Sequence, residues 1–304
     1  MCSALDLCVL RALRGLLTRD HRMSQNLVIR IADVAVSIEG EVSGEIAPHY
    51  LPFVGRGKAD ISLRMHRAIP EIVLGEKVFD SPPIWKLYRE NGSSIIRLFP
   101  EMADLQRTLF LPHHLKHADL FFANDSDRFM DPFFGPTLEL LLIHYLAQEK
   151  GVVLHACGIV IEESAILFLG ESGAGKSTLA RMWDKENNVH ILSDDRVIVR
   201  KKDSEFRAYG TPWHGEAAFG SPRQANLERI FFLRHGKKNS VKDVKGLDLV
   251  SQLLTCSFTP LWDPQAMEIV LKFFSQVADR VPCQELTFRP EKNALALVKK
   301  ISKW

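Results

Sequence analysis

A glycine-rich segment of the chain has the residue types and spacing needed to bind a phosphate group. It reads Gly170-Glu171-Ser172-Gly173-Ala174-Gly175-Lys176-Ser177-Thr178 and follows the apolar run 165–169. This order predicts a buried strand, a tight turn and a helix beginning near Gly175, so that backbone N–H groups and the helix N-terminus point at the phosphate. Lys176 would add a point charge for the β- and γ-phosphates, and the Ser177 hydroxyl is placed to bind Mg²⁺. The segment from Gly170 to Thr178 therefore predicts a P-loop that binds ATP with Mg²⁺.

Two adjacent carboxylates are the next candidates for chemistry. Asp194 and Asp195 follow the apolar residues 190–192, which predict a short strand next to the P-loop strand. Many nucleotide-binding enzymes hold Mg²⁺ at the end of such a strand, and successive side chains of an extended segment point in opposite directions. One aspartate would then serve the metal ion and the other would serve as a general base. The structural alternative is an Asp-Asp turn that only ends the strand.

The composition argues against several classes of protein. The 304 residues carry a net charge of +2, with 46% hydrophobic and 25% charged residues, as in soluble globular proteins. So small a net charge gives no electrostatic argument for nucleic acid or an anionic membrane as a partner. No apolar run approaches the roughly 18 residues of a membrane span. The five cysteines are scattered without a C-x-x-C spacing, which favours a reducing, cytoplasmic location over a disulfide framework or a zinc site.

The first half of the chain is rich in strand signals. Ile61, Leu63 and Met65 alternate with polar residues, as in a half-buried strand, and Asn91-Gly92 between two apolar runs predicts a hairpin. Turn residues are dense over 125–136, which predicts a boundary there. We therefore expect an N-terminal extension over 1–22, a small antiparallel β-rich domain over 23–130 and a P-loop domain over 131–304. Met23 stays open as an alternative start to Met1, because a strand pattern begins directly after it.

The second half alternates strands and helices around the P-loop, which predicts an α/β core. We expect strands over 152–161, 165–169, 189–192, 197–200, 206–209, 227–234 and 284–288. We expect helices over 138–148, from 176 to about 184, and over 247–256, 264–279 and 291–301.

Three segments together resemble the catalytic domain of bacterial HPr kinase/phosphorylase. They are His155, the P-loop 170–177 and Ser193-Asp194-Asp195-Arg196-Val197. A histidine in an apolar strand is, taken alone, more often a core residue. In that family, however, a histidine precedes the P-loop and an aspartate pair followed by a strand comes after it, at offsets that this sequence matches. The resemblance covers roughly residues 150–235 and implies the P-loop kinase core shared with ATP-dependent phosphoenolpyruvate carboxykinase.

The resemblance also implies a role for each site residue. Asp194 would be the catalytic base that activates a serine hydroxyl, and His155 would orient that aspartate. Lys176 would hold the β- and γ-phosphates, while Ser177 and Asp195 would bind Mg²⁺. The implied activity is transfer of the γ-phosphoryl group of ATP to a hydroxyl, such as a serine of a protein or peptide. A carboxylate within hydrogen-bond reach of a hydroxyl can accept its proton as the bond to phosphorus forms.

One later stretch departs from that family. Residues 209–216, Tyr-Gly-Thr-Pro-Trp-His-Gly-Glu, are similar instead to a divergent HPr-kinase-like group, so the acceptor stays open between a protein, a peptide and a small molecule such as a sugar. Trp213 either stacks on a nucleotide base or anchors the loop to the core, and His214 and Glu216 either serve the site or belong to a structural turn. A non-catalytic module that binds ATP and a partner is the alternative class of function. Self-association into a homo-oligomer is left open.

Overall fold

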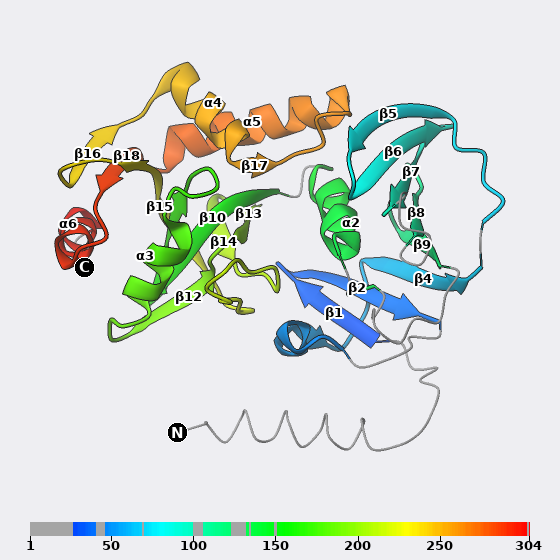
Figure 1. Ribbon diagram of the computed structural model, residues 1–304, viewed down its shortest axis with the longest axis horizontal. Coiled ribbons are helices and arrows are strands. Elements are labelled where there is room, and N and C mark those ends of the chain that lie inside the picture. The colour runs from blue at the N-terminus through cyan, green and yellow to red at the C-terminus, as the bar shows by residue number, and fades with distance from the viewer. Residues whose placement is uncertain are drawn as a thin grey trace, which may run out of the picture.

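The computed structural model describes residues 27–40, 46–68, 70–99, 106–122, 132–133, 135–148, 151–302 and 304. Two nine-stranded sheets lie side by side, and helix α2 (Thr137–Leu146) lies between them (Figure 1). The chain is therefore a mixed α/β protein with large sheets, as the sequence predicts at this level. The expected extension over 1–22 and the choice between Met1 and Met23 lie outside the described residues.

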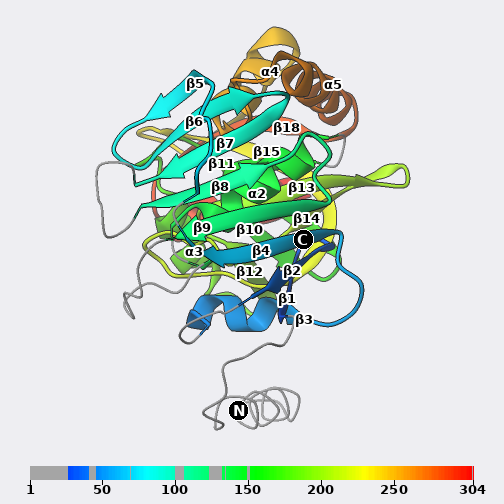
Figure 2. The same ribbon diagram turned by 90° about the vertical axis from the view of Figure 1, so that its right-hand side faces the viewer.

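The first sheet is formed by the strands that precede α2. They are β1 (Leu27–Ile31), β2 (Val34–Glu39), β3 (Val54–Gly55), β4 (Ile61–Arg67), β5 (Glu76–Ser81), β6 (Trp85–Glu90), β7 (Ser93–Leu98), β8 (Arg107–Leu111) and β9 (His117–Phe122), with a short 3₁₀ helix, η1 (Pro48–Phe53), before β3. Their order across the sheet is β3-β1-β2-β4-β9-β8-β7-β6-β5, which Figure 2 shows from bottom to top.

The first sheet is mixed, so the prediction of an antiparallel domain is wrong. Strand β4 runs parallel to both of its neighbours, β2 and β9. The local predictions fare better: β4 buries Ile61, Leu63 and Met65 on one face. The turn between β6 and β7 uses Asn91 and Gly92 at φ 49° and 76°, the left-handed values of a tight hairpin. Local patterns describe strands and hairpins, whereas pairing between strands far apart in the chain leaves no local signature.

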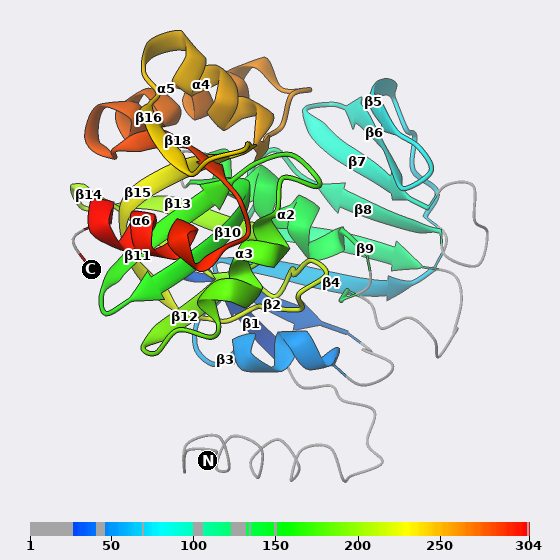
Figure 3. The same ribbon diagram turned by 60° about the vertical axis from the view of Figure 1, so that its left-hand side comes forward.

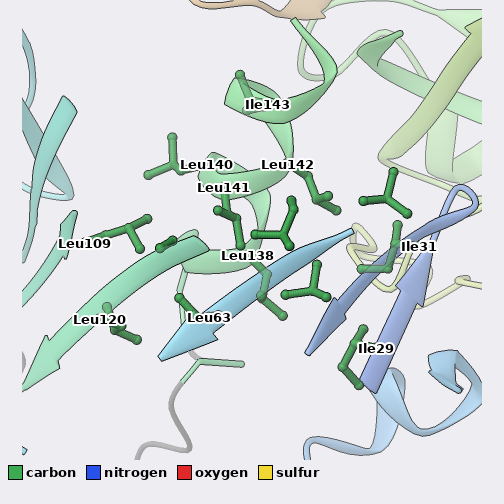
Figure 4. Packing of buried hydrophobic residues seen from close by; sticks show 14 of the residues in the cluster. Ile29, Ile31, Leu63, Leu109, Leu120, Leu138, Leu140, Leu141, Leu142 and Ile143 are labelled. Atoms are coloured by element: carbon green, nitrogen blue, oxygen red, sulfur yellow. The ribbon is translucent and has the colours of Figure 1, made fainter. Parts of the chain in front are cut away.

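Helix α2 packs into a core that both sheets share. Leu138 and Leu141 belong to the same buried cluster as Leu63 of the first sheet (Figure 4). That cluster also contains Val153 and Ile198 from the second sheet. Burying one such side chain contributes roughly 1.5–3 kcal/mol, so α2 stabilises both halves at once. The helix was assigned to the C-terminal domain from the sequence, and the expected boundary between residues 130 and 131 stays a prediction.

The second sheet surrounds the glycine-rich turn. Its strands are β10 (Val152–Ile161), β11 (Ser164–Leu169), β12 (Val189–Ser193), β13 (Arg196–Lys202), β14 (Glu205–Tyr209), β15 (Gln224–His235), β16 (Ser240–Asp243), β17 (Ser257–Phe258) and β18 (Cys283–Phe288). Strand β10 pairs with β11, β12, β13 and β17, all antiparallel. Strand β15 runs parallel to both β11 and β18. The short strands β16 and β17 have no counterpart in the sequence prediction.

Helices cover both faces of the second sheet. They are α3 (Lys176–Trp183), α4 (Gly246–Thr255), α5 (Pro264–Arg280) and α6 (Lys292–Ser302), as Figure 3 shows. Successive residues of β11 point to opposite faces: Ile166 and Phe168 pack with α3 and α6, whereas Leu167 and Leu169 pack with α4 and α5. A strand buried on both faces explains the unbroken apolar run before the glycines. Among the described helices, none is both long and apolar enough to cross a membrane.

Candidate functional site

The connection from β11 to α3 is a tight turn that requires glycine at two points. Gly173 and Gly175 have φ of 82° and 99°, values that residues with a side chain rarely adopt. A Cβ atom on Gly175 would also lie only 2.8 Å from the ring of Phe288. Helix α3 begins at Lys176, so its unpaired N–H groups and the positive end of its dipole come directly after the glycines. The strand–turn–helix order expected from the sequence is therefore present.

The side chain of Lys176 folds back over this turn. It is only 6% exposed, and its Nζ donates to the carbonyl oxygens of Gly170 at 2.8 Å and Glu171 at 3.0 Å. Burial is the largest influence on this ammonium group and lowers the pKa of Lys176. The turn thus holds the Lys176 ammonium group against two uncharged carbonyl oxygens, which bind it more weakly than an anion would.

Asp194 is buried, and its carboxylate accepts four hydrogen bonds. The Ser177 hydroxyl donates to Oδ2 at 2.9 Å. The backbone N–H groups of Gly215, Ala217 and Phe219 donate at 2.9, 2.9 and 3.2 Å. Since a carboxylate has about four lone-pair positions, Asp194 uses its whole accepting capacity inside the protein. It fixes the Ser177 hydroxyl to a distant loop.

Asp195 faces the other way and contacts His155. Its Oδ1 lies 3.1 Å from Nε2 of His155, and its side chain keeps 20% of its surface exposed. Burial, and then the positive charges of Lys176 and Arg196, lower the pKa of His155 to about 4. The imidazole is therefore neutral near pH 7, and the contact is a hydrogen bond rather than an ion pair. Because the ionised carboxylate only accepts, Nε2 carries the proton in this arrangement.

Arg196 connects Asp195 to helix α2. Its Nη1 donates to Oδ2 of Asp195, and its Nε donates to Oε1 of Glu139 at 2.6 Å. The guanidinium also lies over the ring of Phe258, 4.8 Å from its centroid. Burial raises the pKa of Glu139, although Arg196 opposes the shift. Asp195 is thus held between a cation on one side and a neutral imidazole on the other.

The loop over 211–216 is anchored to the core by its tryptophan. Trp213 is 8% exposed, and its indole N–H donates to the hydroxyl of Tyr50 at 2.9 Å. Its carbonyl accepts a hydrogen bond from the Ser193 hydroxyl, also at 2.9 Å. Of the two alternatives for Trp213, the structure therefore favours the anchor. His214 is exposed, with its ring centroid 5.3 Å from that of His49.

The site residues surround one cavity of about 240 Å³. Ten residues considered for the site from the sequence line it: His155, Ser172, Gly173, Gly175, Lys176, Ser177, Thr178, Asp194, Asp195 and Glu216. Gly170, Glu171 and Ala174 are not among its lining residues. Sequence reasoning missed Arg181 and Gly215, which do line it. Arg181 follows Ser177 by one helical turn, a spacing that places both on one face of α3 and that could have revealed it.

The pairs within the site differ from those that the resemblance implies. Ser177 contacts Asp194 rather than Asp195, and His155 contacts Asp195 rather than Asp194. The physical reason is that three backbone N–H groups from residues 215–219 bind Asp194 and bury it. The catalytic and metal roles of these residues stay predictions.

Comparisons with known proteins add little to this geometry. No family model matches the chain, and no curated protein matches it. Among solved structures, it has a weak resemblance to the Hpr(Ser) kinase/phosphatase from Coxiella burnetii, with a TM-score of 0.29 and 14% sequence identity over 50% of this chain and 88% of that one. A TM-score of this size does not establish a common fold.

Proposed function

We propose that this chain is an ATP-dependent kinase that transfers the γ-phosphoryl group to a hydroxyl. The observation that supports this most is that three units line one cavity: the glycine turn with Lys176, the Ser177–Asp194 pair and the Asp195–His155 pair. Nucleotide binding requires only the first unit. Phosphoryl transfer also requires a group that accepts the proton of the attacking hydroxyl.

The turn over 170–177 would hold the phosphates of ATP. Gly173 has open space where a side chain would be, which lets phosphate oxygens approach the backbone. The N-terminus of α3 favours negative charge there. Lys176 would exchange its two carbonyl partners for β- and γ-phosphate oxygens, which bind an ammonium group more strongly.

Ser177 and Asp194 fit a magnesium ion. Both supply the oxygen ligands that Mg²⁺ prefers, and their oxygens lie 2.9 Å apart. No group of three or more His, Cys, Asp or Glu side chains among the described residues could hold a metal by itself. This suits an ion that completes its shell with waters and phosphate oxygens. When bound, Mg²⁺ would neutralise the charge that develops on the phosphates. Asp194 thus takes the place that the resemblance gave to Asp195.

Asp195 is the base in this proposal, in place of Asp194. Backbone N–H groups occupy three of the four lone-pair positions of Asp194. The fourth, which accepts from Ser177, would go to Mg²⁺, so none is left for an acceptor hydroxyl. Asp195 is partly exposed in the cavity, and Arg196 and the neutral His155 orient it. A carboxylate held in this way can accept the hydroxyl proton as the bond to phosphorus forms. His155 keeps the orienting role expected for it.

Three variants test the proposal with radiolabelled ATP, Mg²⁺ and separate protein and small-molecule fractions of a cell extract as acceptors. Asp195→Asn should lower phosphoryl transfer by about 10²–10⁴-fold, the usual contribution of a general base, without weakening ATP binding. Lys176→Ala should abolish ATP affinity. Asp203→Asn, at an exposed turn, is the matched control and should change neither.

Each alternative has its own signature in this experiment. Transfer by Asp195→Asn at the wild-type rate would show that Asp195 is not the base. Wild-type ATP affinity of Lys176→Ala would refute the nucleotide site. Tight ATP binding without any labelled acceptor would favour the non-catalytic module, which has no use for the Asp195–His155 pair.

A further inference from the structure

A second cavity lies beside the first, next to residues 195–196 and 214–215. It measures about 540 Å³ and lies between the first sheet, the start of α2 and the second sheet. Its walls include His49, Tyr50, Glu139, Arg196, Trp213 and His214.

The two cavities lie next to each other at two pairs of neighbouring residues. Asp195 lines the first and its neighbour Arg196 lines the second. In the same way, Gly215 lines the first cavity and the adjacent His214 lines the second. The Arg196 guanidinium also donates a hydrogen bond to Asp195. A molecule in the second cavity would therefore lie next to the carboxylate that serves as the base.

The walls of the second cavity combine aromatic rings with hydrogen-bonding groups. The rings of Tyr50 and Phe133 have centroids 4.9 Å apart, and Trp213 is bonded to Tyr50. Burial, followed by the nearby His214, lowers the pKa of His49, so its imidazole is neutral near pH 7. The only acid among the lining residues, Glu139, is paired with Arg196. The cavity thus offers apolar faces and polar edges with little net charge.

We propose that this second cavity is the acceptor site and that its occupant is a small molecule with a hydroxylated ring. The inference rests on the proposed kinase function and names the substrate class for it. The volume lies within the roughly 300–1,000 Å³ of small-molecule sites. Aromatic side chains pack against the faces of such a ring, and the imidazoles and the guanidinium hydrogen-bond to its hydroxyl groups.

A peptide or protein acceptor fits these walls less well. An extended peptide binds most readily by adding a strand to a free sheet edge, and the edge strands of the first sheet, β3 and β5, contribute no residue to this cavity. Recognition of a protein surface by charge would need unpaired charged groups, whereas the Arg196 and Glu139 side chains that line this cavity are paired with each other.

The bond changes of phosphoryl transfer in this arrangement involve only ATP, the acceptor hydroxyl and Asp195. A lone pair of the acceptor oxygen forms the bond to the γ-phosphorus of ATP. The bond from that phosphorus to the β,γ-bridging oxygen breaks, and its electron pair leaves with ADP. The hydroxyl proton passes to Asp195 and from there to water.

A cavity-filling variant tests the location of the acceptor site. Ile84 lines the second cavity and is 44% exposed, so Ile84→Trp would fill space there without disturbing the core. Val73→Trp is the matched control, since Val73 is 75% exposed and lines neither cavity. The full-length variants are assayed for ATP binding and for transfer of label into the small-molecule and protein fractions of a cell extract.

We expect label from wild-type protein in the small-molecule fraction, in compounds that separate from ATP by chromatography and that periodate oxidation of vicinal hydroxyls destroys. Ile84→Trp should reduce this transfer by about tenfold or more, a loss equivalent to roughly 1.4 kcal/mol of binding, with unchanged ATP affinity. Val73→Trp should transfer as wild type. His214→Ala should raise KM for the small-molecule acceptor and leave kcat unchanged.

Other outcomes would refute either the acceptor site or the kinase function, and the assay distinguishes the two. Label confined to the protein fraction, or full transfer by Ile84→Trp, would refute the acceptor site while leaving a kinase. Binding of ATP with no label in either fraction would refute the kinase function itself.

Discussion

Replacing Asp194 by asparagine should damage the fold more than any exposed Asp→Asn change. Asp194 is 1% exposed, and its Oδ2 accepts from Ser177 and Ala217 while Oδ1 accepts from two further N–H groups. In the best orientation of the amide, its NH₂ replaces Oδ2. The Ser177 hydroxyl can rotate and accept instead, but the N–H of Ala217 loses its partner.

The magnitude follows from these contacts. One orphaned N–H at a partly buried position costs about 1–3 kcal/mol, and the two remaining backbone N–H bonds lose the extra strength of a charged acceptor, about 1 kcal/mol each. Asp194→Asn should therefore lower the free energy of unfolding by about 3–5 kcal/mol. Asp195→Asn, at a partly exposed side chain, should cost only about 1 kcal/mol.

Urea unfolding followed by circular dichroism measures this difference. Asp203→Asn is the matched control, since it makes the same chemical change at an exposed turn and should stay within about 0.5 kcal/mol of wild type. If Asp194→Asn proves as stable as Asp203→Asn, the four hydrogen bonds do not hold residues 215–219 in place, and Asp194 is free to act as the base.

Three further predictions concern single side chains. The pKa of His155 is lowered to about 4, so between pH 6.5 and 4 the unfolded chain binds more protons than the folded one. The free energy of unfolding therefore falls as the pH drops through this window. In urea titrations near pH 7 and pH 4, His155→Gln should remove about 3 kcal/mol of that loss. Gly175→Ala should lower the free energy of unfolding by about 1–3 kcal/mol and weaken ATP binding, because residue 175 has a φ of 99° and the new methyl group would meet Phe288. Calorimetry measures both quantities, and wild-type values would contradict the turn geometry. Trp213→Phe should lose about 1–2 kcal/mol by removing the bond to Tyr50; a double-mutant cycle with Tyr50→Phe that shows no coupling would contradict it.

The contiguous parts of the structure were predictable from the sequence. Most elements around the glycine turn have a local signal: an apolar run for β11, glycines for the turn, an amphipathic pattern for the helices. The short strands β16 and β17 have none. The mixed order of the first sheet was not predictable, because the parallel pairing of β4 with β2 and β9 joins segments with no shared local pattern. The sharing of α2 between two sheets escaped prediction for the same reason.

The candidate site divides in the same way. The glycines of the turn, and Arg181 one helical turn after Ser177, can be identified from their spacing in the sequence alone. The exchange of partners between Asp194 and Asp195 could not, because it depends on N–H groups more than twenty positions away in the chain. Glu139 has no sequence signal either, since it reaches Arg196 from a different element.

The core that α2 shares between the sheets has a consequence for how the molecule melts. Leu138 and Leu141 pack in one cluster with side chains of both sheets, so neither half can unfold without exposing apolar surface of the other to water. Heat should then produce one cooperative transition with equal calorimetric and van't Hoff enthalpies, rather than two successive ones. Any ligand that binds only the folded second sheet would raise the melting temperature of the first sheet equally.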